Sequence, residues 1–421
     1  MRLFYSLLFY GLLPFILLRL GWRGIKAPAY RLRWRERLGF YPQSPLKDVI
    51  WIHAVSVGEA EAVFPLLKQL QQAHPSQHFL VTTTTPTGSA RVTAVMGDSV
   101  SHVYLPYDTF GAVRRFFTHF QPKVAIILET EIWPNLFAAC GQRHIPLVII
   151  NACLSEKSAR GYQKIPYLVQ STLANITLIA AQTEADAQRF LAIGATAKQI
   201  QVYGNIKFDS PPQDGAIAEG RQLRKQIFSE RFVWIIASTH QEEEAYFLAL
   251  YAQCKVIAPD LLLLIVPRHP ERFHEVQQLC LKSALKVVMR TAATSCDSAT
   301  DVYIADTLGE LKMLYAAADI AFVGGSLVPI GGHNVIEPAA VNVPIMFGPY
   351  MDNVRLIADG LLKANAAVQC ADIPALLSSF KHLYVDAAYR QTLAQNAQHF
   401  VKQNQGAITR ILALLQPIIR R

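Results

Sequence analysis

The stretch with the strongest chemical signature is residues 321–340, which read AFVGGSLVPIGGHNVIEPAA. Two glycine pairs separate a short apolar run from a new helical pattern, in which Asn334 and Glu337 have the spacing of a helix cap. Glycine lets a backbone approach a ligand closely, and the N–H groups of a first helical turn attract anions. We therefore predict a phosphate site here, with Glu337 binding sugar hydroxyls. The plain alternative is that Glu337 only caps its helix.

Four charged side chains in the first half of the chain follow runs of apolar residues. Glu59 opens a helix, where the helix dipole keeps a carboxylate ionised, as a general base must be. Glu129 and Glu131 lie two residues apart beside Trp133, and packing alone does not explain two carboxylates there. Lys207 follows a later run and is a candidate cation for a departing phosphate. The plain alternatives are a common first-turn acid for Glu59 and a solvated surface lysine for Lys207.

The second half adds one phosphate-binding candidate and no sign of a metal. Arg268 follows an apolar run and Pro267, and its planar guanidinium suits a phosphate. No Asp-x-Asp pair occurs, and the 12 histidines show no ligand spacing. The six cysteines have no paired spacing, which indicates a reducing compartment. We therefore predict neither a metal nor a cofactor.

Short apolar runs alternate with helical patterns along most of the chain, which predicts an α/β protein with two doubly wound Rossmann-like domains. In such sheets ligands lie beyond the carboxyl ends of the strands. A Pro/Gly/polar cluster at residues 210–216 is the predicted linker between an N-terminal domain, 21–209, and a C-terminal domain, 217–421. The predicted strands are Val49–Val55, Phe79–Thr84, His102–Leu105, Val124–Leu128, Leu147–Ile150, Leu178–Ala181 and Gln201–Val202, then Phe232–Ala237, Leu261–Val266, Lys286–Met289, Val302–Ala305, Ile320–Val323 and Val343–Phe347.

Residues 1–20 are predicted to form an uncleaved membrane anchor. The run from Leu3 to Leu18 carries no charge, and no small residues typical of a signal-peptide cleavage site follow it. Residues 1–38 hold eight Arg or Lys against one acid, most of the net charge of +9, so a nucleic-acid groove is not indicated. These arginines place the domains on the cytoplasmic side, against anionic headgroups. The alternative is a buried core helix.

Eight sequence strings occur in one order along nearly the whole chain: WIHAVSVGE, TTTPTGS, ETEIWPN, GNIKFD, ASTHQEEE, VPRHPERF, TLGEL and GGSLVPIGGHNVIEPAA. Together they resemble the 3-deoxy-D-manno-octulosonic acid (Kdo) transferases of lipopolysaccharide synthesis. The resemblance implies a GT-B fold, with two domains facing a central cleft, and an enzyme of the inner membrane. It also implies CMP-Kdo as donor, a lipid A precursor (lipid IVA) as acceptor, and inversion at the anomeric carbon of Kdo.

The resemblance further implies roles for single residues. Glu59 matches the base that takes the proton of the acceptor hydroxyl, and Glu129 and Lys207 match the positions that stabilise the transition state. The residues that match the CMP contacts of the family are Pro267, Arg268, Leu308, Gly309, Glu310, Asn334, Val335, Ile336 and Glu337.

The chain departs from the family at one motif. The family pattern N-x-R-x-S corresponds to residues 151–155, which read NACLS, so Cys153 stands where the family has arginine. Arg160 is the candidate substitute for that arginine.

Two other functions fit parts of the sequence. A sugar-nucleotide epimerase uses the same two-domain scaffold but needs no membrane anchor. A non-catalytic, membrane-bound nucleotide sensor would keep the phosphate site without needing Glu59 as a base.

Overall fold

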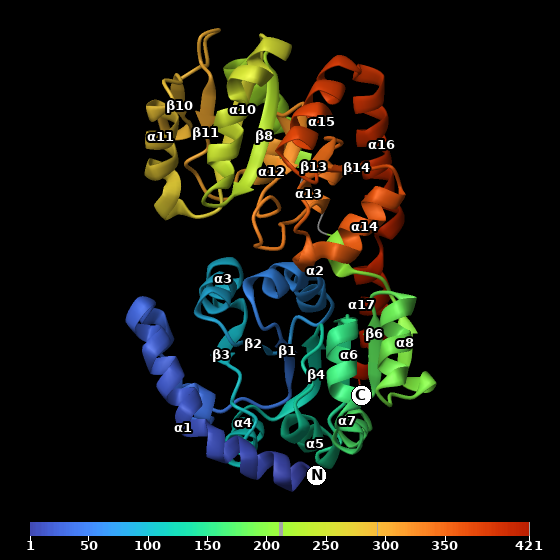
Figure 1. Cartoon of the computed structure of the whole chain (residues 1–421). Helices are drawn as coiled ribbons and strands as arrows, with labels where there is room; N and C mark the ends of the chain where they lie inside the picture. Colours follow the sequence, from blue (N-terminus) through green and yellow to red (C-terminus); the bar gives the residue numbers. More distant parts are fainter. Residues whose placement is uncertain (210–213, 293, 421) are drawn as a thin grey trace. The chain divides into compact units, whose positions relative to one another are not determined.

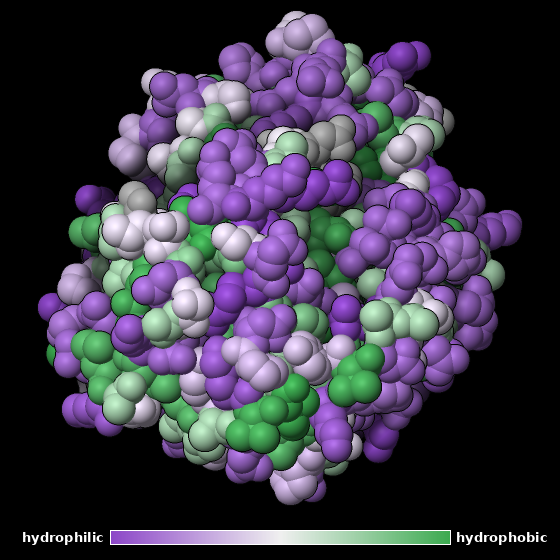
Figure 2. Space-filling model, turned by 90° about the horizontal axis from the view of Figure 1, so that it is seen from above, coloured by the Kyte–Doolittle hydropathy of each residue, from purple (hydrophilic) through white to green (hydrophobic). Residues whose placement is uncertain are grey.

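The computed structural model describes residues 1–209, 214–292 and 294–420. The chain divides into two compact units: unit 1 comprises Met1–Ser210 and Gln405–Arg421, and unit 2 comprises Pro211–Asn404. Each unit has its own parallel sheet with helices on its faces (Figure 1), which confirms the predicted α/β class. One face of the molecule, shown in Figure 2, is mostly hydrophilic, with hydrophobic residues gathered in small separate patches.

Unit 1 is built on a 7-stranded sheet in the order β3-β2-β1-β4-β5-β6-β7, and all its strand pairs are parallel. Every residue of β1, β2 and β5 is buried, because these apolar runs are covered on both faces of the sheet. The strand order reverses between β1 and β4, which is where such sheets open a crevice. The strands are β1 (Val49–His53), β2 (Phe79–Thr83), β3 (Ser101–Tyr104), β4 (Pro122–Leu128), β5 (Leu147–Ala152), β6 (Leu178–Ala181) and β7 (Ile200–Val202).

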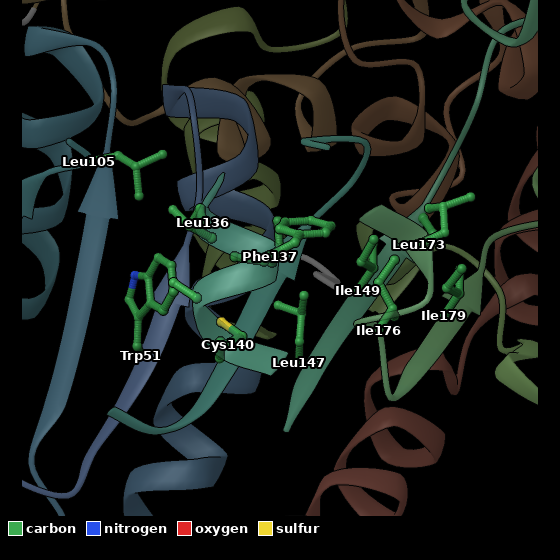
Figure 3. Close-up of a cluster of buried hydrophobic side chains, with 14 of the residues drawn as sticks. Trp51, Leu105, Leu136, Phe137, Cys140, Leu147, Ile149, Leu173, Ile176 and Ile179 are labelled. Carbon is green, nitrogen blue, oxygen red and sulfur yellow. The ribbon is translucent and has the colours of Figure 1, made fainter. Parts of the chain in front are cut away.

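Two apolar layers cover this sheet. The first joins Trp51 of β1 and Ile149 of β5 to Phe137 and Cys140 of α5, as Figure 3 shows. The second packs α2 and the C-terminal helix α17 on the opposite face. The helices of unit 1 are α1 (Arg2–Lys26), α2 (Val57–Ala73), α3 (Pro86–Met96), α4 (Phe110–Phe120), α5 (Pro134–Gln142), α6 (Glu156–Gln163), α7 (Pro166–Leu173), α8 (Glu184–Ala192) and α17 (Ala407–Ile419).

Unit 2 repeats the design with a 7-stranded parallel sheet in the order β10-β11-β9-β8-β12-β13-β14. Here the order reverses between β8 and β12. The sequence predicted six of these strands and missed β14. The strands are β8 (Phe232–Thr239), β9 (Leu261–Pro267), β10 (Val287–Met289), β11 (Val302–Ile304), β12 (Ile320–Val323), β13 (Ile345–Phe347) and β14 (Ala367–Gln369). The helices are α9 (Asp214–Leu223), α10 (Glu243–Ile257), α11 (Phe273–Lys282), α12 (Leu311–Ala316), α13 (Ile336–Ala340), α14 (Arg355–Lys363), α15 (Ile373–Val385) and α16 (Ala387–Asn404).

The predicted domain limits need two corrections. The C-terminal domain does not extend to residue 421, because α17 buries Ile408, Ile411 and Leu415 in the core of unit 1. Asp209 fixes the start of α17, since its carboxylate accepts hydrogen bonds from the backbone N–H groups of Gly406 and Ile408. The predicted linker is also shorter than 210–216: residues 210–213 lie outside the described residues, and α9 already begins at Asp214.

The N-terminal helix α1 is longer than the predicted anchor of residues 1–20, since it continues to Lys26. Its span Arg2–Ile25 has a mean hydropathy of 1.9, so it is long and apolar enough to cross a membrane. It lies along the outside of unit 1, passing α5 and α4 (Figure 1). This apolar helix is consistent with the predicted membrane anchor.

Candidate functional site

In unit 1, Glu59 lies beyond the carboxyl end of β1, in the first turn of α2. Ser56 before it has extended backbone angles, so the chain leaves the strand and enters the helix at once. The backbone N–H of Val55 donates to Glu59 Oε2 at 2.8 Å, and Ser56 Oγ donates to Oε1 at 3.2 Å. These contacts fix the carboxylate at the point where the strand order reverses.

The environment of Glu59 differs from the sequence-based expectation of a carboxylate kept ionised by the helix dipole. Its side chain is buried, and the pKa of Glu59 is raised to about 7, with burial as the largest cause. The negative charges of Glu129 and Glu131 also act to raise this pKa, while the hydrogen bonds from Val55 and Ser56 act to lower it. A carboxylate with a pKa near neutrality is better suited to accept and release a proton than a fully ionised surface acid.

Glu129 and Lys207 form an ion pair next to the Glu59 carboxylate. Glu129 directly follows β4, the neighbour of β1, and has a φ of 57°, a left-handed conformation that costs a non-glycine residue about 1–2 kcal/mol. Lys207 Nζ lies 3.0 Å from Glu129 Oε1. Burial acts to lower the pKa of Lys207, but the Glu129 charge and hydrogen bond outweigh it and raise this pKa, with Glu59 adding to the effect. The lysine is therefore a fixed cation beside the two carboxylates.

A chain of amide side chains positions Lys207. The side-chain Oδ1 of buried Asn151 accepts a hydrogen bond from the backbone N–H of Ile206 at 3.1 Å. The backbone carbonyl of Asn151 accepts another from Gln182 Nε2 at 2.9 Å. Gln182 in turn accepts from Asn205 Nδ2 at 2.9 Å, and Asn205 Oδ1 accepts from the backbone N–H of Lys207 at 2.9 Å. Strands β5, β6 and β7 thus jointly hold the turn that carries the lysine.

Cys153, which stands where the resemblance implies an arginine, belongs to the same cluster. The pKa of its thiol is raised to about 12, chiefly by burial and also by the carboxylates of Glu129 and Asp186. The thiol is therefore neutral at pH 7 and brings no positive charge. Arg160, the candidate substitute, has a side chain that is 74% exposed and pairs with Glu156 at 3.1 Å on α6. In this structure Lys207 is the cation that contacts Glu129.

In unit 2, the glycine loop after β12 holds a carboxylate of the protein itself, which corrects the predicted phosphate cradle. The side chain of buried Glu243 accepts from the backbone N–H groups of Gly325 at 2.7 Å and of Ser326 and Leu327 at 3.0 Å each. The glycine at 324 is required here, because a Cβ would lie 2.7 Å from the Ser238 carbonyl oxygen. This loop binds an anion as expected, but the anion is internal.

Beside this loop lies a basic cluster at the carboxyl ends of β8, β9 and β12. His240 and His333 stack with their Nε2 atoms 2.8 Å apart, and His269 packs against His240. The pKa of His333 is lowered to about 4, chiefly by burial and also by His240 and Arg268. Arg268 follows β9 directly and is exposed, so its guanidinium is available to a ligand. Neutral imidazole N–H groups and one arginine suit a phosphate.

The remaining predicted donor contacts lie at the same edge of this sheet. Leu308 and Gly309 follow β11 and are exposed, and Gly309 has a φ of 88°. Glu310 is bound by Arg290 through two hydrogen bonds of 3.0 and 3.1 Å, which lower its pKa. Because neighbouring strands β11, β9, β8 and β12 end together, the sequence-predicted residues 267–268, 308–310 and 334–337 converge at one edge.

The predicted helix cap has a different geometry. The cap position of α13 is Val335, and the side chain of Asn334 accepts a hydrogen bond from the backbone N–H of Ile336 at 3.0 Å. Sequence reasoning also missed Glu243 and the stacked histidines. The string ASTHQEEE contains Glu243, but nothing in it identifies which acid folds back onto the glycine loop.

A family model described as 3-Deoxy-D-manno-octulosonic-acid transferase (kdotransferase) matches residues 32–210. The chain is 40% identical to the 3-deoxy-D-manno-octulosonic acid transferase of Haemophilus influenzae, over 100% of this chain and 99% of that protein.

Two solved structures share the fold. One is a glycosyltransferase from Rickettsia africae, with 13% identity and a TM-score of 0.58 over 89% of this chain and 99% of that one. The other is UDP-GlcNAc 2-epimerase from Neisseria meningitidis bound to UDP-GlcNAc, with 14% identity and a TM-score of 0.58 over 88% and 100%. A transferase and an epimerase share this fold, so the fold alone does not choose between the two reactions.

Proposed function

This chain belongs to the 3-deoxy-D-manno-octulosonic acid (Kdo) transferase family and is a glycosyltransferase, and from that premise we propose that it transfers Kdo from CMP-Kdo to a lipid A precursor with inversion. The observation that carries the mechanism is the buried carboxylate of Glu59, with a pKa of about 7, beside the Glu129–Lys207 pair.

In the proposed reaction, unit 1 binds the acceptor and supplies the base. The acceptor hydroxyl oxygen attacks the anomeric carbon of Kdo, the bond from that carbon to the CMP phosphate oxygen breaks, and Glu59 takes the hydroxyl proton. Attack from the face opposite the leaving group inverts the anomeric centre. Lys207, held by Glu129, stabilises the negative charge that develops as CMP departs. The proposal includes neither a metal nor a cofactor.

Unit 2 is the proposed donor-binding unit. Arg268 contacts the CMP phosphate, supported by the neutral histidines beside it. Pro267, the segment Leu308–Glu310 and the segment from Asn334 to Glu337 contact the rest of the nucleotide. Support comes from their convergence at one edge of the sheet, on the side where doubly wound domains bind nucleotides.

The proposed location is the cytoplasmic side of the inner membrane. Helix α1 supplies an apolar surface, and Arg31 and Arg35 after it are exposed, lining a hollow of about 860 Å³. Arg33 and Arg37 of the same basic segment have structural roles instead: Arg33 pairs with buried Glu36 at 2.7 Å, and Arg37 donates to a backbone carbonyl. Exposed arginines next to an apolar helix suit the phosphates of a glycolipid or of its neighbours.

Transfer assays test this function directly. The purified protein is incubated with CMP-Kdo and a tetra-acylated lipid A precursor in detergent with EDTA, and CMP release and the mass of the glycolipid are followed. We expect CMP release that depends on the lipid, and a product heavier by Kdo. CMP release without a glycosylated lipid, or epimerised sugar nucleotide, would refute the transferase proposal. Binding of CMP without any turnover would favour the sensor.

Replacement of Arg268 by alanine tests the donor site. The variant loses a charge-assisted contact to phosphate, so the Kd for CMP should rise about 10- to 100-fold. Isothermal titration with CMP measures this change. Arg221→Ala, which removes an exposed arginine from α9, is the matched control and should bind CMP as the wild type does. An unchanged Kd for Arg268→Ala would remove this arginine from the donor site.

A further inference from the structure

An apolar cavity of about 460 Å³ lies in unit 1 between the first turns of α1, the segment after Glu129, and α7. Its volume lies within the range of about 300–1,000 Å³ that is usual for ligand sites. Tyr5 and Phe9 of α1 form one wall, Ile132 and Trp133 another, and Ile165 and Leu168 a third. These walls are mainly hydrocarbon, and the polar groups of Tyr5 and Trp133 already bond to Asp108 and Glu131, so this part of the cavity suits a hydrocarbon better than a nucleotide or a sugar.

The wall formed by α1 is fixed to the rest of unit 1. Ser6 Oγ donates to Asn135 Oδ1 at 3.0 Å, and the Tyr5 hydroxyl donates to Asp108. Asp108 is itself buried and accepts from the backbone N–H groups of Asn135 and Leu136 at 2.9 and 2.8 Å, so it caps α5. A buried polar cluster therefore ties α1 to the helix that begins at the cavity.

The opposite face of α1 carries the apolar surface that remains for a membrane. Its exposed large side chains follow a helical spacing and form one continuous stripe: Leu3, Phe4, Leu7, Leu8, Leu12, Phe15, Leu18, Trp22 and Ile25. The first turns of α1 contact α5, and further along the helix the Tyr10 hydroxyl accepts a hydrogen bond from the backbone N–H of Gly111 at 2.9 Å, at the start of α4. A helix held at successive turns along one side of a protein suits a place along the membrane surface, with the stripe dipping into it.

The polar end of the cavity adjoins the proposed catalytic cluster. Thr130 and Glu131 line it, and they follow Glu129 in the chain. Burial raises the pKa of Glu131, and the charge of Glu129 raises it further, so the two carboxylates interact. Trp133, on the apolar side, donates to Glu131 Oε2 at 2.8 Å. The short segment from Glu129 to Trp133 thus lines the cavity at one end and carries, at the other, a carboxylate whose charge acts on Glu59.

We infer that this cavity holds an acyl chain of the glycolipid acceptor while its sugar head lies at Glu59. The inference rests on the proposed function, because it needs an acceptor with both a sugar and acyl chains. Membrane contact through the stripe on α1 brings the cavity to the depth where such chains begin. The acyl chain leaves the bilayer along α1. Its place in the cavity then aligns the attacking hydroxyl of the sugar head.

Substitution of Ile165, which lines the cavity and is 44% exposed, tests this assignment. Ile165→Asp introduces a charge that a hydrocarbon cannot pair with. The assay compares kcat/KM for the tetra-acylated acceptor with kcat/KM for the same phosphorylated disaccharide without acyl chains. We expect this ratio to fall at least tenfold. Ile165→Trp, which fills space without adding charge, should lower the ratio for long chains more than for short ones.

Tyr167→Asp is the matched control, since Tyr167 lies two residues after Ile165 in the first turn of α7, is 76% exposed and is not among the residues that line the cavity. It adds the same charge near the membrane and should leave the ratio at the wild-type value. An equal fall of this ratio in Ile165→Asp and Tyr167→Asp would show repulsion from the membrane and overturn the inference. Equal losses of kcat/KM on both acceptors in Ile165→Asp would also overturn it. A wild-type protein that transfers no Kdo overturns the proposed function, and the acceptor role of the cavity with it.

Discussion

Glu59→Gln is expected to lower kcat for Kdo transfer by about 10²- to 10⁴-fold, the usual contribution of a general base. Glutamine has nearly the same shape, and its carbonyl oxygen can still accept the hydrogen bond that Val55 donates to Glu59. The variant should therefore fold normally and bind CMP with an unchanged Kd. Initial rates and CMP titration measure the two quantities separately.

The pH dependence of the wild type provides a second view of the same residue. A base acts only when it is deprotonated, and the ionised fraction of Glu59 rises steeply with pH below its pKa of about 7 and approaches one above it. The value of kcat/KM should therefore rise about tenfold per pH unit below that pKa and level off above it. We call this rise below the pKa the acidic limb of the pH profile. The residual activity of the Glu59→Gln protein should not show it.

Glu61→Gln is the control for this experiment. Glu61 lies on the same helix turn, but its carboxylate is exposed and pairs with Arg91 on the surface. Its loss should leave both rate and pH profile unchanged. A Glu59→Gln protein as active as the wild type would end the assignment of the base.

Much of the fold could be predicted from the sequence because parallel sheets covered on both faces need continuous apolar strands. A continuous apolar run such as Leu261–Pro267, which is buried along its whole length, is typical of such a strand. Strand β14 was missed because its three residues, Ala367–Gln369, include a single β-branched side chain. The helix α17 shows a clear apolar face, but no local pattern states which unit that face covers.

The site was predictable in its residue types and less so in its electrostatics. Glu59 and Glu129 are recognisable as acids at strand ends, yet the raised pKa of Glu59 depends on burial and on a charge from a strand 70 residues later, which no local pattern contains. The glycine loop was predicted to bind a phosphate, whereas its N–H groups bind a carboxylate of the protein. Its anion, Glu243, lies 82 residues before Gly325 in the chain, and only folding brings them together.

Lys207→Met is the second substitution with a large expected effect. The change removes the cation that pairs with Glu129 and leaves that carboxylate without its partner beside Glu59. Loss of one preorganised charge at a developing anion costs about 10²- to 10³-fold in kcat. The variant should also move the acidic limb of the pH profile to higher pH, because a nearby positive charge favours the ionised form of Glu59.

Glu129→Gln should move this limb in the opposite direction. The Glu129 charge raises the pKa of Glu59, so its removal lowers that pKa and shifts the limb to lower pH. Lys198→Met, at an exposed lysine of the same unit, should change neither kcat nor the limb. If Lys207 were needed only for folding, Lys207→Met would lower activity without moving the acidic limb. Shifts of opposite sign in Lys207→Met and Glu129→Gln require that both charges act on one titrating base. An acidic limb at the wild-type pH in both variants would show that the ion pair does not influence Glu59 and would contradict its proposed role.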